Sequence, residues 1–323
     1  MREFVKPILI VSKCLGFAHC RYNGLIISDE FVEKLKNYVE FNPVCPELEI
    51  GLGVPRDPVR VVKVNGDIRL IQPSTGRDLT DTMLNLTESF LDSVSAVDGF
   101  ILKSRSPSCG TKDTKIYPSA ESHAVIDKGS GFFGRAILSE FPYLAVEDEG
   151  RLTNFRIREH FLTRIFTFAG FRKVKALNSM KDLVKFHSEN KLLLMSYNQK
   201  EMRELGRITA NNGGKSIKEV IKDYEQHLYR AFYQAPRYVS NINVLMHGLG
   251  YFSDSLTHEE KAFFLDSLEK YRLGKVPLSV PLNILRSLIV RFKEEYLMSQ
   301  TFFEPYPEGL VEITDSGKGM EYK

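Results

Sequence analysis

The sequence predicts an α/β domain followed by a helical bundle, and three observations support this prediction. Up to about residue 150, short apolar runs of strand type alternate with segments of helical spacing. Residues 152–168 have the pattern of a connecting helix, and beyond them the strand signals fade. Apolar residues then recur three or four positions apart, as in packed helices. We therefore expect domains at residues 1–160 and 161–310, followed by a flexible tail at 311–323.

The first half has the pattern of a sheet whose strands are joined by helices. Three apolar runs are typical of strands, and they cover residues 7–12, 99–104 and 143–148. Three segments have the apolar spacing of helices, and they cover residues 29–39, 79–94 and 130–141. Strands separated by helices pair in parallel because the connection must cross back over the sheet. We expect a mostly parallel, Rossmann-like or flavodoxin-like sheet with helices on both faces.

Turn and cap residues mark several boundaries of these elements. Asn65-Gly66 lies between two alternating runs and tolerates the positive φ angles of a tight turn, which predicts a hairpin over residues 59–72. Thr257 followed by Glu260 is a capping box and predicts a helix start. Breaks between helices in the second half are expected at Gly213-Gly214, Pro236, Gly274 and Pro277.

Composition excludes some classes of protein. In a chain of 323 residues, no apolar run approaches the roughly 18 residues needed to cross a membrane. The N-terminus has only a short apolar stretch, so a signal peptide is not expected. Four cysteines in a chain of this length do not resemble a disulfide framework. We expect a soluble, cytoplasmic protein with reduced thiols and no membrane partner.

The near-neutral total charge conceals a basic second half. The chain has 44 Lys and Arg against 41 Asp and Glu, but residues 170–300 hold 21 against 14. Aromatic residues lie among these cations, as in DYEQHLYRAFYQAPRYVSN. Cations neutralise phosphates and aromatic rings stack on unpaired bases, so nucleic-acid binding is one interpretation. The alternative is that these aromatic residues belong to the helical core.

Three of the four cysteines are placed to meet at one edge of the predicted sheet. Cys14 follows the run at 7–12, Cys45 lies between two prolines, and Cys109 lies in SPSCG after the run at 99–104. Loops at the carboxyl ends of parallel strands converge on one edge, where such folds keep their sites. The neighbouring prolines would hold a thiolate in a fixed geometry.

Several chemistries use such a set of thiols. Structural zinc favours four ligands in CxxC pairs, and the sequence has no CxxC. A nucleophilic cysteine needs a base such as His19 or His123. Three separated cysteines suit an iron–sulfur cluster with one iron free of protein ligands. Buried cysteines also act as small hydrophobic residues, a role less suited to three of them in loops rich in Pro and Gly.

Longer strings in the sequence resemble a known family. The strings CLG…CRYNG, NPVCPELEIGLGVPR, KSRSPSCG and YLAVEDEGRL, within residues 5–160, resemble the TudS family of thiouracil desulfidases. The strings LGRITANN, NVLMHGLGYF, EKYRLGKVPLSVPL and TFFEPYP resemble the YbgA-like helical domain that is often fused behind it. The combined architecture is similar to enzymes that remove sulfur from thiolated uridine in transfer RNA.

The resemblance implies a cofactor and its ligands. The three cysteines that hold a [4Fe–4S] cluster in the family match Cys14, Cys45 and Cys109. Cys20 is then accessory or structural. The family's usual Arg-Tyr-Asp-Gly has Asn23 in place of Asp, which removes a carboxylate, and the turn after Cys14 differs from the usual Cys-Leu-Leu-Gly.

The resemblance also implies candidate catalytic residues. Glu47 is the candidate to activate water or carry its proton, and Ser106 and Ser108 are candidates to hydrogen-bond the base or the tetrahedral intermediate. Arg21 and Lys103 are candidate substrate contacts. All of these except Arg21 also have a structural interpretation: Glu47 as a helix cap, the serines as turn residues beside Pro107, and Lys103 as a solvated strand end.

The resulting expectation is redox-neutral, hydrolytic desulfuration of thiouridine in tRNA, either 4-thiouridine or 2-thiouridine. An open iron of the cluster binds the thione sulfur, and the helical half binds the RNA. One alternative is a desulfidase that acts on free thiouracil, and a second is an RNA-binding module with a structural cluster. Electron transfer by the cluster is the least favoured alternative. The ring position and the oligomeric state do not follow from the sequence.

Overall fold

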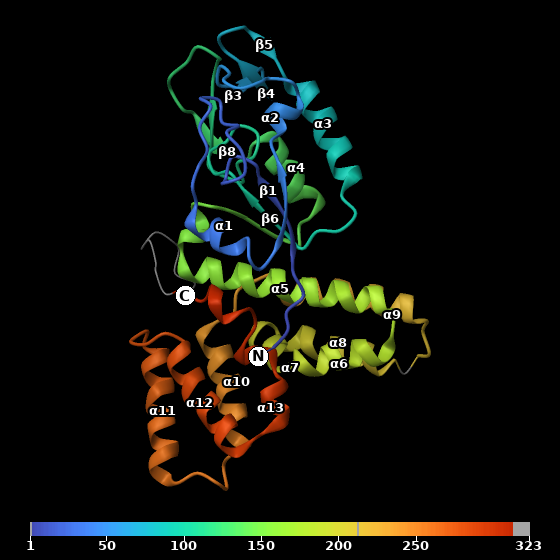
Figure 1. Cartoon of the computed structure of the whole chain (residues 1–323), viewed down its shortest axis with the longest axis vertical. Helices are drawn as coiled ribbons and strands as arrows, with labels where there is room; N and C mark the ends of the chain where they lie inside the picture. The colour runs from blue at the N-terminus through green and yellow to red at the C-terminus, as the bar shows by residue number, and fades with distance from the viewer. Residues whose placement is uncertain (1, 212, 313–323) are drawn as a thin grey trace. The chain divides into compact units, whose positions relative to one another are not determined.

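The computed structural model describes residues 2–211 and 213–312, and it has two compact units (Figure 1). Residues 4–169 and 309–312 form an α/β unit, and residues 2–3 and 170–308 form a helical unit. This confirms the predicted fold class, an α/β region followed by an all-helical region. Of the predicted tail, only Val311 and Glu312 belong to the described residues.

The α/β unit begins with a strand and alternates strands with helices. Its elements are β1 (Ile8–Ser12), α1 (Glu30–Leu35), β2 (Glu40–Val44), α2 (Pro46–Glu49), β3 (Arg60–Val64), β4 (Asp67–Gln72), β5 (Arg77–Asp78), α3 (Thr80–Ser93), β6 (Gly99–Leu102), β7 (Thr114–Tyr117), β8 (Asp127–Gly129), α4 (Phe132–Glu140), β9 (Ala145–Asp148) and a 3-10 turn η1 (Arg151–Thr153). Helix α5 (Phe155–Leu177) begins in this unit and ends in the helical unit.

The first sheet is wholly parallel, with strand order β2-β1-β6-β9. Its central strands β1 and β6 are buried because they consist almost entirely of apolar residues. The sequence pattern did not reveal β2, whose residues EFNPV are half exposed and lack alternation. Its Pro43 is tolerated because β2 is an edge strand, where one side needs no ladder hydrogen bonds.

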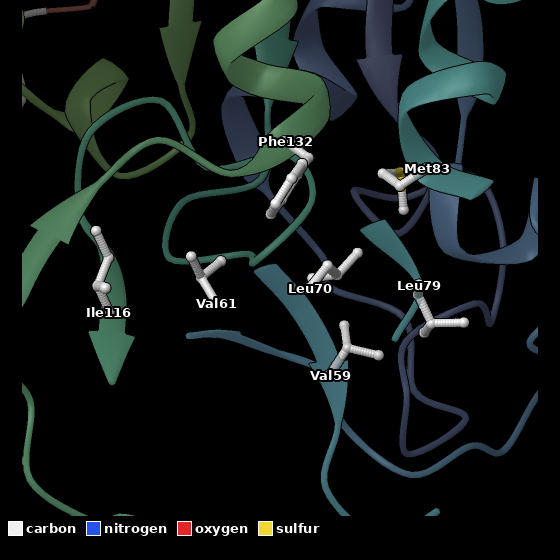
Figure 2. Close-up of a cluster of buried hydrophobic side chains, with 7 residues drawn as sticks. All are labelled: Val59, Val61, Leu70, Leu79, Met83, Ile116 and Phe132. Carbon is white, nitrogen blue, oxygen red and sulfur yellow. The ribbon is translucent and has the colours of Figure 1, made fainter. Parts of the chain in front are cut away.

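The predicted hairpin is confirmed, but it belongs to a second sheet that the sequence did not indicate. This sheet has the order β5-β4-β3-β7-β8, with β3 antiparallel to β4 and parallel to β7. Asn65 and Gly66 form the turn, with φ angles of 52° and 94°. One apolar face of this sheet packs against helices α3 and α4, and Figure 2 shows the cluster: Val59, Val61, Leu70, Leu79, Met83, Ile116 and Phe132.

The helical unit holds the remaining helices. They are α6 (Met180–Glu189), α7 (Lys191–Tyr197), α8 (Gln199–Ala210), α9 (Ile217–Ala231), α10 (Tyr238–Gly250), α11 (His258–Arg272), α12 (Ser279–Phe292) and α13 (Glu295–Ser299), with a 3-10 turn η2 (Thr301–Phe303). A second 3-10 turn, η3 (Glu308–Leu310), begins at the last residue of the helical unit and continues into the α/β unit. The capping box of Thr257 and Glu260 opens α11 as predicted. In the core, the Tyr224 ring stacks on Phe171 with centroids 5.4 Å apart.

A polar network fastens the end of the helical unit to α6 and α7. The Gln300 side chain accepts a hydrogen bond from the Leu192 N–H (3.0 Å) and donates one to the Ser188 carbonyl (2.9 Å). The Thr301 hydroxyl donates to the Asn190 side chain (2.8 Å). These polar groups are satisfied internally, as buried polar groups must be. Within the described residues, no helix is both long enough and apolar enough to cross a membrane.

Candidate functional site

Three cysteines follow three neighbouring strands of the parallel sheet. Cys45 directly follows β2, Cys14 lies two residues after β1, and Cys109 lies in the loop after β6. The chain passes from β1 to one side of the sheet and later returns to the other side at β6. The gap between β1 and β6 is therefore the switch point of the sheet, where α/β folds bind their ligands. Cys45 and Cys109 are buried and Cys14 is partly exposed, as expected for a site that is enclosed but open to a ligand on one side.

The first turn of α4 holds the Cys109 loop rigidly. Phe132 N–H donates to the Pro107 carbonyl (3.2 Å), and Gly134 N–H donates to the Ser108 carbonyl (3.0 Å). The helix and loop backbones approach so closely that a Cβ on Gly131 would lie 2.4 Å from the Ser108 carbonyl oxygen. Glycine is needed at this position because any side chain would overlap the loop backbone.

Two serine side chains lower the pKa of the Cys109 thiol, against the effect of burial. Burial raises the pKa of Cys109 to about 12, and hydrogen bonds from Ser12 and Ser106 act in the opposite direction. The Ser12 oxygen also accepts the Lys103 N–H (2.9 Å), which links the ends of β1 and β6. The Ser106 oxygen accepts the N–H groups of Ser108 (3.2 Å) and Cys109 (3.0 Å). Ser106 therefore stabilises the turn, as predicted for a turn residue beside Pro107, and it also lowers the pKa of the Cys109 thiol.

Cys20, expected to be accessory or structural, lies among the other thiols. The Cys45 sulfur lies 3.9 Å from the Cys20 carbonyl oxygen. A hydrogen bond to Cys14 raises the pKa of Cys20 to about 11, and one from Cys45 partly offsets it. The interaction of the Cys45 thiol with the Cys20 thiol raises the pKa of Cys45, and burial raises it further. The thiols of Cys14, Cys20 and Cys45 thus lie close enough to shift one another's pKa values.

Glu47 and Ser108 are brought together although 61 residues separate them. The Ser108 hydroxyl donates to Glu47 Oε1 at 2.8 Å. The other carboxylate oxygen, Oε2, accepts from Arg56 Nε at 2.9 Å and Nη2 at 2.6 Å. Sequence reasoning missed Arg56, although it ends the string NPVCPELEIGLGVPR that contains Glu47.

Lys103 and Arg21, the two candidate substrate contacts, interact with neighbouring protein side chains. The Lys103 ammonium forms an ion pair with Glu149 and donates to the Ser104 carbonyl (3.0 Å). The Arg21 guanidinium lies over the Tyr22 ring, 5.7 Å from its centroid. The structure thus places Lys103 in an ion pair at the end of β6 rather than as a solvated strand end.

The donor set is more suitable for a cluster than for a single ion. Within residues 2–211 and 213–312, no three His, Cys, Asp or Glu side chains are arranged to bind one metal ion. Ligands of one tetrahedral ion all lie about 2.0–2.3 Å from it, whereas thiolates on a [4Fe–4S] cluster bind separate irons at separate corners. Three cysteines on loops after neighbouring strands fit the second arrangement.

Comparison with known proteins agrees with the two halves of the sequence. Residues 9–149 match the model of the 2-thiouracil desulfurase family, and residues 191–307 match a family described as a protein of unknown function, DUF1722. The uncharacterized protein YbbK of Bacillus subtilis is 33% identical over 113 residues, which are 32% of this chain and 74% of YbbK. The uncharacterized protein YbgA of Escherichia coli is 26% identical over 164 residues, 50% of this chain and 96% of YbgA.

One solved structure is also similar to part of the chain. It is titled a [4Fe-4S]-dependent thiouracil desulfidase, TudS, and is 28% identical, with a TM-score of 0.37. The similarity covers 46% of this chain and 93% of that one. The family match and the identity to YbbK confirm the resemblance seen in the sequence strings. The chain belongs to the 2-thiouracil desulfurase family through its N-terminal part, and it carries a DUF1722 domain behind it.

Proposed function

We propose that this chain removes sulfur hydrolytically from the thiolated uracil ring of thiouridine in tRNA, with a [4Fe–4S] cluster bound by Cys14, Cys45 and Cys109. One observation carries the proposal: in a member of the 2-thiouracil desulfurase family, these three cysteines follow three neighbouring parallel strands at the switch point of the sheet. The reaction exchanges the ring C=S and water for C=O and hydrogen sulfide, so no electron donor is needed.

The chemistry that the cluster supplies when bound is Lewis-acid polarisation of the C=S bond at an iron without a protein ligand. The protein residues hold and orient the three thiolates. Ser12 and Ser106 lower the pKa of Cys109 and so favour its thiolate, and the first turn of α4 fixes the loop that carries it. Such contacts around metal-binding thiolates set their orientation and basicity.

Glu47 and Ser108 form the proposed proton path. Because the Ser108 hydroxyl donates to Glu47 Oε1, its own lone pairs remain able to accept a proton from water. As water attacks the ring carbon, its proton passes to Ser108 Oγ and the Ser108 proton passes to Glu47 Oε1. Glu47 then returns the proton to the departing sulfur. The second water proton, still on the new hydroxyl, reaches the sulfur by the same path as the C=O bond forms, so the products are the carbonyl and hydrogen sulfide. Of the two serines named from the resemblance, this proposal assigns proton transfer to Ser108 and support of Cys109 to Ser106.

Cluster analysis and turnover test the catalytic proposal directly. Anaerobically purified protein should contain about four irons per chain and convert thiouridine to uridine, as detected by nucleoside mass spectrometry. Glu47→Ala should keep its iron and lose most of its turnover, with a slow residual rate that can still be measured. Bound zinc in place of iron, or an iron-loaded protein that leaves thiouridine and thiouracil intact, would contradict the proposal.

Exposed cations on two packed helices support tRNA as the substrate. Helices α8 and α9 pack against each other in the helical unit. Their exposed basic residues are Lys200, Arg203, Arg207, Lys218, Lys222 and Arg230, of which Arg207 forms an ion pair with Glu204. Lysines and arginines of this kind neutralise backbone phosphates, and binding that depends on them weakens with salt.

A charge-reversal variant separates RNA binding from chemistry. Lys218→Glu with Lys222→Glu should weaken tRNA binding about tenfold or more at low salt, since each lost phosphate contact reduces the counterion release. Turnover of free 2-thiouracil by this variant should equal that of the unchanged protein. Filter binding and mass spectrometry supply the two measurements.

Free 2-thiouracil is the second candidate substrate, and the description of the matching family names it. Equal turnover of the free base and of thiolated tRNA, with no tRNA binding by the unchanged chain, would favour this candidate over the first.

A further inference from the structure

The Arg56 guanidinium is buried where three segments of the α/β unit meet. Its side chain is 5% exposed, and Nη1 donates to the Cys20 and Gly53 carbonyls, both at 3.0 Å. Nε and Nη2 donate to Glu47, and the Arg56 backbone N–H donates to the Tyr22 carbonyl at 2.8 Å. Arg56 thus joins the Cys20 loop, the Gly53 turn and helix α2.

The two hydrogen bonds to Glu47 go to the same oxygen. Nε and Nη2 both contact Oε2, so Oε1 is left for the Ser108 hydroxyl. A carboxylate held at one oxygen by a rigid, planar guanidinium and at the other by a buried hydroxyl cannot rotate into another position without breaking these bonds. The Glu47 side chain is only 13% exposed, so water does not replace the lost partners easily.

Charge gives a second reason for a cation at this place. Glu47 lies close enough to Cys45 and Cys109 to interact with both thiols electrostatically. Three thiolates and a carboxylate in one buried region repel each other, and a cation fixed beside the carboxylate offsets this. Arg56 supplies that charge through a short ion pair, and its fork geometry supplies the direction.

We propose that Arg56 is the positioning residue of this site: it holds the Glu47 carboxylate so that Oε1 stays on Ser108 and remains ready to receive a proton. Arg56 acts through Glu47 and does not touch the substrate. This inference rests on the desulfuration proposed above, and it adds the residue that makes the Glu47–Ser108 pair rigid.

Conservative substitution separates positioning from simple support of the fold. Arg56→Lys keeps the charge, but its three donors share one nitrogen and cannot reproduce the four hydrogen bonds of the planar Arg56 guanidinium. Its kcat on the thiolated substrate should fall about 10- to 100-fold, because small displacements of a catalytic group cost about this much. Its KM should stay within about threefold, and its iron content and visible spectrum should be unchanged. Arg69→Lys, on β4 in an exposed ion pair with Asp78, is the matched control and should keep full kcat.

A double-variant cycle tests whether Arg56 acts through Glu47. Glu47→Ala with Arg56→Lys should be no slower than Glu47→Ala alone, because the second change has nothing left to misplace. Multiplied losses in the double variant, loss of iron in Arg56→Lys, or wild-type kcat in Arg56→Lys would each overturn the positioning role.

Unfolding of the metal-free protein gives a readout that does not depend on turnover. Arg56→Gln and Glu47→Gln, singly and together, should show coupling of at least about tenfold in the unfolding equilibrium constant. Absence of coupling would overturn the inference even if the enzyme is active. An unchanged protein that turns over no thiolated substrate, yet shows the coupling, would locate the failure in the proposed function and leave Arg56 with a purely structural role.

Discussion

Cys45 and Cys20 differ in their expected importance for iron although they lie in contact. Cys45 directly follows strand β2, whereas Cys20 lies in the long loop between β1 and α1. We predict that Cys45→Ala loses the visible absorption and most of its iron, because one corner of the cluster has no ligand. Cys20→Ser should keep about four irons per chain, since the three ligand thiols remain. Iron analysis after anaerobic purification measures both, and equal loss in the two variants would make Cys20 a ligand.

At the residue scale, the sequence indicated that Cys14 and Cys109 follow strands, but it did not indicate that Cys20 lies with Cys14 and Cys45 or what orients Glu47. The strand patterns before Cys14 and Cys109 predicted one sheet edge for both, because loops after parallel strands share that edge. Arg56 follows Glu47 by nine residues, a spacing that has no meaning on a helix or strand. Only the turn through Gly53 brings its guanidinium back to the carboxylate, and turns of this kind leave no periodic signal.

At the scale of elements, the sequence did not reveal strands that are too short or too exposed to show alternating apolar and polar residues. β2 is an edge strand with exposed polar residues, and β5, β7 and β8 are two to four residues long. Periodicity needs more positions than these strands contain. The hairpin at 59–72 was visible because both strands are longer and Asn65-Gly66 marks the turn. Its membership of a separate sheet depended on pairing between β3 and β7, which the sequence pattern does not specify.

The contact between α4 and the Cys109 loop leads to a prediction at this scale. A Cβ on Gly134 would lie 2.4 Å from the Gly110 carbonyl oxygen, so Gly134→Ala must push the helix and the loop apart. We expect a loss of about 1–3 kcal/mol in unfolding free energy, typical of overpacking, and a lower iron content. Gly250→Ala is the control, because a Cβ there meets nothing within 4 Å. Denaturant unfolding and iron analysis measure the two effects. Equal unfolding free energies and equal iron contents in Gly134→Ala and Gly250→Ala would contradict the prediction.

For the whole molecule, the chain connects its two units in a way that the sequence did not indicate. After the helical unit, residues 309–312 return to the α/β unit. Leu310 is buried, and the Arg158 guanidinium donates to the Glu312 carbonyl at 2.8 Å. The sequence did not predict that residues 309–312 pack in the α/β unit. A short segment that docks on a preformed surface needs only one or two apolar residues, and so few residues form no recognisable pattern.

A partly buried histidine in each unit makes the stability of the folded protein depend on pH. Burial, reinforced by the nearby Lys191 charge, lowers the pKa of His187 in the helical unit to about 4, and burial, reinforced by the Arg164 charge, lowers the pKa of His160 in the α/β unit to about 3. Both folded units therefore favour neutral imidazole, whereas an unfolded chain binds the proton near pH 6.5. Their stabilising effect is complete above about pH 6.5 and is lost as the pH falls toward these lowered values.

We therefore predict that the thermal unfolding temperature decreases between pH 7 and pH 4.5, and that His187→Gln weakens this decrease. Glutamine stays neutral across the range and, like the His187 ring, which lies 3.2 Å from the Tyr224 hydroxyl, it can hydrogen-bond that group. Residual acid sensitivity in the variant should come from His160, so His160→Gln with His187→Gln should weaken the decrease further. His123→Gln, at an exposed loop position, is the control and should follow the unchanged protein. If His187→Gln and His123→Gln unfold at the same temperature at each pH, protonation of His187 does not contribute to the acid sensitivity.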